Sequence, residues 1–115
     1  MSAELAGTAV DRQVALSRVG GDVQLLKEIA VLFLDDYPKA LAGLREAAAK
    51  GDAKEVERTA HGLKGSVANF GARAAVEAAL AIEGLGRTRQ LAEVEHVLQT
   101  LELALAALRP ELEAL

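Results

Sequence analysis

Apolar residues recur three or four positions apart along most of this 115-residue chain, and that spacing predicts α-helices. A short helix is expected over residues 11–18. A long helix should follow, beginning after the N-cap residue Asp22 and ending at Gly51, which suits a left-handed C-terminal position. Its apolar stripe passes Pro38 without losing phase. The pattern therefore predicts one helix kinked near residues 34–38, with two helices and a tight break as the alternative.

Three shorter helices are expected over residues 53–70, 73–85 and 90–108. Asp52 and Thr88 are the expected N-caps of the first and the last of these helices. The middle helix has four expected core positions, which are Val76, Ala79, Leu80 and Ile82.

Four amphipathic helices joined by short loops predict an all-α fold. The expected architecture is an up-down-up-down antiparallel four-helix bundle, with the short N-terminal helix capping one end. We interpret residues 1–115 as a single domain with its core within about 11–108, because this length suits one packed core.

Composition removes several classes of function. The net charge of −4 and the pI of about 5.2 argue against non-specific binding to nucleic acid. The absence of cysteine excludes disulfides, zinc–thiolate sites and cysteine nucleophiles. The most apolar run, residues 30–34, is too short to span a bilayer, and the N-terminus lacks the basic segment of a secretory signal. We therefore expect a cytoplasmic protein without a membrane partner.

One of the two histidines has informative neighbours. At about 100° per residue, His61 falls on the side of its helix opposite the apolar stripe, so it should face solvent. Lys64 and Gly65 follow at i+3 and i+4 on the same outer face, and Ala68 follows at i+7. The outer face thus presents an imidazole, an ammonium group and then almost no side chain.

A glycine inside a helix, such as Gly65, destabilises the helix by about 1 kcal/mol relative to alanine. Helix stability does not explain an exposed Gly65, whereas access of a partner's backbone to His61 does. Exposed imidazoles are mostly neutral nucleophiles at pH 7, and Lys64 could offset the charge of a phosphoryl group. On these residues alone, an ordinary surface histidine among small residues stays open as an alternative.

Glu83 is a candidate partner for the imidazole. Two helices that form an antiparallel hairpin about Gly71 would bring His61 and Glu83 to similar heights. Glu83 could then accept a hydrogen bond from one ring nitrogen and leave the other free. The alternative is an ordinary surface pair between Glu83 and Arg87 at i+4.

The remaining polar candidates are interpreted as surface residues. His96 lies on a face flanked by Glu and Gln. The acidic pair Asp35 and Asp36 lacks further ligands at a spacing that would hold a metal.

The run Ala-His-Gly-Leu-Lys-Gly-Ser at residues 60–66, followed by Asn-Phe-Gly-Ala at 69–72, resembles the signature of histidine phosphotransfer (HPt) domains. The resemblance extends from about Asp11 to Leu108. It includes the opening of the long helix, the run through Pro38 to Asp52, and Ile-Glu at residues 82–83, which is similar to a later leucine–glutamate pair of the family.

This resemblance implies a phosphorelay role and assigns the site. His61 would carry the phosphoryl group, Lys64 would stabilise it, Gly65 would leave room for a partner, and Glu83 would orient the imidazole. The implied partners are a sensor histidine kinase and the receiver domain of a response regulator. The chain itself would need no cofactor, because Mg²⁺ is expected on the acidic residues of the receiver.

A receiver over His61 would press against the face formed by Arg58, Gly65, Ala68 and Ala72, together with part of the long helix. Two alternatives stay open, namely an adaptor of the same fold without phosphorylation and a domain excised from a larger hybrid or chemotaxis-type histidine kinase. The sequence contains no P-loop and no glycine-rich ATP lid, so an enzyme with its own nucleotide site is not expected. We expect a monomer.

Overall fold

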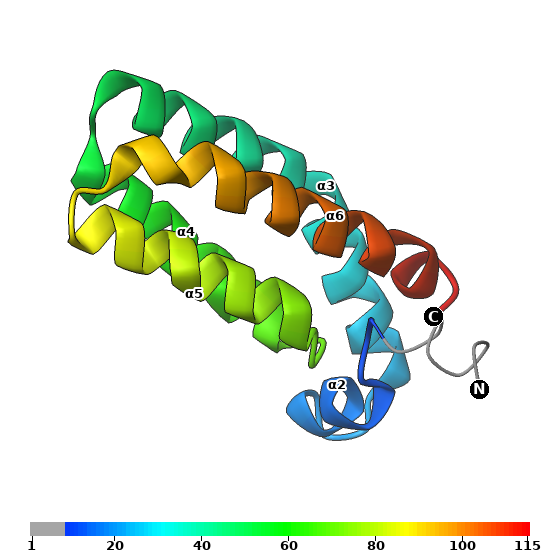
Figure 1. Ribbon diagram of the computed structural model, residues 1–115. Helices are drawn as coiled ribbons and strands as arrows, with labels where there is room; N and C mark the ends of the chain where they lie inside the picture. The colour runs from blue at the N-terminus through cyan, green and yellow to red at the C-terminus, as the bar shows by residue number, and fades with distance from the viewer. Residues whose placement is uncertain (1–8) are drawn as a thin grey trace, which may run out of the picture.

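A computed structural model describes residues 9–115 of the protein (Figure 1). This part of the chain forms five α-helices, one 3₁₀ turn and no strand; the elements are α2 (Arg12–Arg18), α3 (Val23–Lys50), α4 (Ala53–Ala68), α5 (Arg73–Arg87), η1 (Leu91–Glu93) and α6 (Val94–Glu113). Helices α3 to α6 run up and down side by side, and α2 lies at one end of them (Figure 1). The predicted four-helix bundle with a short N-terminal helix is confirmed.

Three aspartates begin helices as local hydrogen-bonding rules require. The side chains of Asp11, Asp22 and Asp52 each accept a bond from the backbone N–H three residues later, at 3.2, 3.0 and 3.1 Å. Gly51 ends α3 with φ of 76°, in the left-handed region that glycine adopts without strain. The predicted starts of α2, α3 and α4 are therefore confirmed.

Helix α3 continues through Pro38 as a single helix of 28 residues. Its first and second halves run in different directions in Figure 1, where the cyan part turns into the green part. Phe33 lies five residues before the proline and packs on Tyr37 and Phe70, with ring centroids 5.4 Å apart in both pairs. Leu41 and Leu44 are buried on the other side of the proline, so packing on both sides of the bend keeps the helix continuous although proline removes one backbone hydrogen bond.

The start of the last helix was predicted wrongly. Thr88 does not cap α6; it ends α5, and its hydroxyl donates to the carbonyl of Gly84 at 2.9 Å. A short 3₁₀ turn follows, and α6 begins at Val94. Thr88 lies six residues before the first residue of α6, which is too far for its hydroxyl to cap that helix. Helix α6 also extends beyond the predicted residue 108, through Pro110 to Glu113.

Leu80 is the one expected core position of α5 that is wrong, since 51% of it is exposed. The alanines of the same helix occupy the core instead, with Ala75 and Ala79 almost fully buried. Small side chains let α5 approach its neighbours closely, which turns the larger Leu80 outward.

The N-terminal helix is fastened to the end of the bundle. The backbone N–H of Asp11 donates to the carbonyl of Phe70 at 2.8 Å. Gly71 has φ of 60°, and a Cβ at that position would lie 2.5 Å from Cβ of Asp11. The Glu111 carboxylate also accepts bonds from the backbone N–H groups of Ala9 and Val10. Helix α2 thus closes the end of the core at the α4–α5 turn.

The core of the bundle is built mainly from leucine, valine and alanine of α3 to α6, with Phe33 and Phe70 as its aromatic members. Among residues 9–115, no helix combines the length and apolar character that crossing a bilayer needs.

Candidate functional site

His61 lies in the middle of α4 and faces solvent. Its side chain is 67% exposed, whereas its neighbours Ala60 and Leu63 are 0% and 5% exposed. The orientation predicted from helical periodicity is confirmed. Helix α5 runs alongside α4 (Figure 1).

The inner nitrogen of the imidazole is held by Glu83 of α5. His61 Nδ1 lies 2.9 Å from Oε2 of Glu83, and Glu83 is only 5% exposed. An ionised carboxylate can only accept hydrogen bonds, so Nδ1 carries a proton, and in the neutral imidazole Nε2 is then the nitrogen with the free lone pair. The contact expected from the α4–α5 hairpin is present. The alternative pair is present too, because Arg87 Nη2 lies 3.3 Å from the same oxygen.

Lys64 contacts the other oxygen of the same carboxylate. Its Nζ donates to Glu83 Oε1 at 2.7 Å, and its side chain is 26% exposed. This hydrogen bond, with a further one from His61, holds the pKa of Glu83 below its ordinary value, although burial acts in the opposite direction. Glu83 is therefore a buried anion that gathers an imidazole and an ammonium group at one place.

A close approach of two helices makes this arrangement possible. A Cβ on Gly86 would lie 2.7 Å from the backbone nitrogen of Glu57 and 3.0 Å from the carbonyl oxygen of Ala53. Only glycine allows α5 to pack this closely on α4. Glu83 lies one turn before Gly86, so its short side chain reaches the face of α4 that carries His61.

No close packing contact requires glycine at position 62 or 65. A Cβ built on either one meets no other atom within 4 Å. Both residues are exposed, and both lie inside α4, where glycine is the poorer helix former. The open space beside His61 is consistent with the predicted role of Gly65 in giving a partner access.

These residues lie within a segment that matches a known family. Residues 28–111 match the family model described as Hpt domain. The chain belongs to the Hpt domain family. Family membership supports a histidine phosphotransfer role.

The fold of this Hpt domain is also found in a solved structure. The crystal structure of histidine-containing phosphotransfer protein B from Pseudomonas aeruginosa PAO1 superimposes with a TM-score of 0.84. The two sequences are 24% identical, and the match covers 92% of each chain. A comparison with curated proteins found no match.

The predicted docking face of the Hpt domain needs one correction. Arg58 is exposed and pairs with Glu55 at 2.6 Å, and Ala68 is half-buried. Ala72, in contrast, is 2% exposed and belongs to the core. The chain turns at Gly71 under the cover of α2, and this turn directs Ala72 inward. Ala72 cannot contact a partner.

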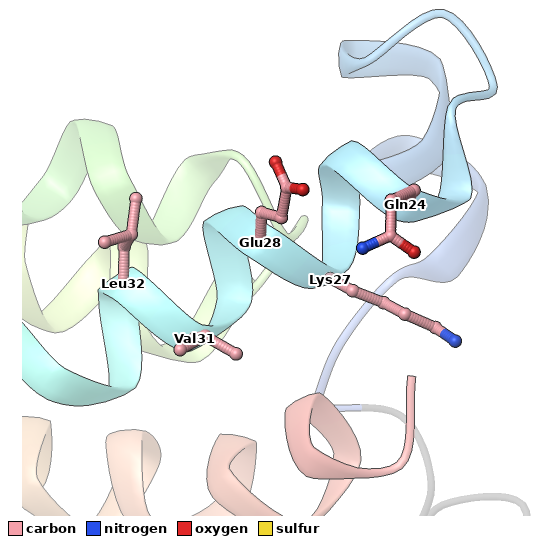
Figure 2. Close-up of a pocket in the computed structure, with 5 residues that line it drawn as sticks. All are labelled: Gln24, Lys27, Glu28, Val31 and Leu32. Atoms are coloured by element: carbon pink, nitrogen blue, oxygen red, sulfur yellow. The ribbon is translucent and has the colours of Figure 1, made fainter.

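The long helix contributes an apolar surface close to this face. Val31 and Leu32 of α3 are adjacent in sequence and 64% and 63% exposed. They line a shallow depression with Gln24, Lys27 and Glu28 (Figure 2). Figure 2 shows Leu32 projecting from the same side of α3 as Glu28, and Val31 from the same side as Lys27.

A groove between α3 and α4 joins this apolar surface to the histidine helix. Its first part is lined by Leu32, Asp36 and Ser66, among others. Its second part is lined by Asp36, Ser66 and Gly62, the residue that follows His61. Leu32 therefore lies at one end of a groove that reaches the histidine helix.

The other polar candidates make no hydrogen bond or ion pair with His61, Lys64 or Glu83, although Asp36 lines the groove between α3 and α4. His96, Asp35 and Asp36 are all exposed. Residues 9–115 contain no group of three or more His, Asp or Glu side chains placed to hold a metal ion.

Sequence reasoning missed the outer part of the network. Arg87 Nε contacts Glu57 Oε2 at 3.2 Å while Arg87 Nη2 contacts Glu83. Glu57 lies four residues before His61, so it shares the same helix face. The four-residue spacing between Glu57 and His61 could have identified Glu57 as a neighbour of the site, because residues four positions apart lie side by side on a helix.

Proposed function

We propose that this Hpt domain is a phosphocarrier of a two-component phosphorelay. It takes a phosphoryl group on Nε2 of His61 and exchanges it with the aspartate of a receiver domain. The observation that carries the proposal is the pairing of an exposed imidazole with a buried carboxylate. Glu83 occupies Nδ1 at 2.9 Å, while the ring itself is open to solvent.

The proposed step needs no base beyond this arrangement. The lone pair of Nε2 attacks the phosphorus of the partner's aspartyl phosphate, forming an N–P bond. The P–O bond to the aspartate breaks, and the aspartate leaves as a carboxylate. The ring gains positive charge while its proton stays on Nδ1, where the Glu83 carboxylate stabilises it. The reverse sequence returns the phosphoryl group to an aspartate.

The neighbours of His61 fit this chemistry. Lys64 is held one turn away and can approach the phosphoryl oxygens, and the space over Gly65 admits the backbone of a partner. We propose a receiver domain and a sensor histidine kinase as the partners. Mg²⁺ would be supplied by the acidic residues of the receiver rather than by this chain.

Labelling from a phosphorylated receiver tests the proposal. The purified protein should acquire an acid-labile, alkali-stable label when mixed with such a receiver. The label should be lost in His61→Gln and kept in His96→Gln, which is the matched control because it removes the other histidine. Label that persists in His61→Gln would show that the assignment is wrong.

Two further measurements separate the alternative functions. An adaptor without phosphorylation would bind a receiver but take no label. A kinase would label itself from ATP alone. We expect no label with ATP and Mg²⁺ in the absence of a partner, and rapid label when a phosphorylated receiver is added.

A further inference from the structure

Arg87 is the cation of the site to which the proposed function assigns no role. It lies on α5 one turn after Glu83, and its guanidinium bridges two carboxylates, Glu83 at 3.3 Å and Glu57 at 3.2 Å. Glu57 is one helical turn before His61 on α4, and Lys64 is nearly one turn after it. The imidazole is therefore flanked along α4 by two cations, with Arg87 on one side and Lys64 on the other.

The two cations are held differently. Lys64 is 26% exposed and contacts Glu83 at 2.7 Å, whereas Arg87 is 61% exposed and both of its contacts exceed 3 Å. Arg87 is thus the more loosely bound and the more exposed of the two. His61 Nδ1 and Arg87 Nη2 contact the same oxygen of Glu83, so the ring and the guanidinium are neighbours.

We propose that Arg87 is a second phosphoryl-binding residue. Once His61 is phosphorylated, the guanidinium separates from Glu57 and Glu83 and binds the phosphoryl oxygens. This inference rests on the proposed function. The carboxylates of Glu57 and Glu83 hold the guanidinium beside the ring in the unmodified protein.

Charge changes on phosphorylation favour this move. The ring gains positive charge, which strengthens its own bond to Glu83 and repels the guanidinium from that oxygen. At the same time, negatively charged oxygens appear on the opposite edge of the ring. A guanidinium has several N–H donors in one plane and matches phosphoryl oxygens with two parallel hydrogen bonds.

The titration of the phosphoryl group reports whether a cation binds it. The protein is phosphorylated chemically with phosphoramidate, and the ³¹P resonance of phosphohistidine is followed against pH. The signal of His61 is assigned by its absence in His61→Gln. A guanidinium in contact favours the more highly charged phosphoryl form, so the midpoint in Arg87→Gln should lie about 0.5 pH higher than in the wild type. Arg87→Lys retains a cation and should recover part of this difference.

Arg45→Gln is the matched control. Arg45 also bridges two glutamates, Glu95 and Glu102, but it does so between α3 and α6, away from the α4–α5 face. Its loss removes an equivalent set of ion pairs and should leave the phosphoryl midpoint unchanged.

The outcomes are distinct. Equal midpoints in wild type, Arg87→Gln and Arg87→Lys would overturn the inference while leaving the phosphocarrier function intact. Absence of a His61 phosphohistidine signal from the wild type would instead contradict the proposed function. If Arg87→Gln does not fold, Arg87→Lys alone decides. A phosphoryl titration midpoint in Arg87→Lys equal to that of the wild type would then refute a contact specific to the guanidinium. A midpoint shifted also in Arg45→Gln would show that general charge, and not contact, sets the titration.

Discussion

Replacing Gly65 separates the stability of the histidine helix from its access to a partner. A Cβ at this position meets no atom within 4 Å, so a larger side chain fits the folded protein without strain. Glycine is the poorer helix former by about 1 kcal/mol against alanine and by somewhat less against glutamine. For a domain of this length, about 1 kcal/mol corresponds to a melting temperature about 4 °C higher. Gly65→Ala and Gly65→Gln should therefore both melt above the wild type.

Phosphotransfer from a receiver should change in the opposite direction. Side chains at position 65 project from the outer face of α4 one turn from His61, where the partner's backbone must approach. Reactions that depend on alignment lose about a hundred-fold for a misplacement of about 1 Å. We expect Gly65→Gln to slow single-turnover transfer about ten-fold or more, and Gly65→Ala to slow it less, in order of side-chain size.

Two controls make the result decisive. Chemical labelling by phosphoramidate, a donor that needs no docking surface, should proceed at the wild-type rate in both variants. Gly43→Ala, at another helix-interior glycine with an open Cβ position, should show the rise in melting temperature on its own. A Gly65→Gln protein that melts higher and transfers as fast as the wild type would refute the access argument.

Three further predictions concern Lys64, Glu83 and Leu32. Lys64→Ala should slow transfer several-fold and also lower the melting temperature, because it removes the shortest hydrogen bond of a buried carboxylate; an unchanged transfer rate would remove Lys64 from the site. Glu83→Gln should be less stable than the wild type above pH 4.5, the ordinary pKa of this carboxyl, because its pKa is lowered in the folded state. The difference in free energy of unfolding between the two proteins should narrow as the pH falls through that lowered pKa. A difference in urea unfolding that does not change with pH would contradict this prediction. Leu32→Asp should weaken transfer from a receiver but not labelling by phosphoramidate, and equal loss in both would place Leu32 outside the docking surface.

The sequence alone predicted the number and order of the helices in the described chain. Helical periodicity and N-caps are local properties, so Asp22 and Asp52 could be recognised without tertiary information. The same periodicity placed His61 on the outer face of its helix. The end of α5 was harder, because the hydroxyl of Thr88 can bond backwards or forwards and only the packed chain selects one.

Packing between helices determined the rest of the site. The predicted α4–α5 hairpin gave the position of Glu83 along the helix axis, opposite His61. The burial of Glu83 depends on the close approach of α5 to α4 at Gly86, which no local sequence pattern reveals. The bridge from Arg87 to Glu57 likewise joins residues 30 positions apart. Ala72 was expected on the docking face, but the turn at Gly71 directs it into the core. Periodicity shows which way a side chain points from its own helix, whereas only tertiary structure decides what it meets there.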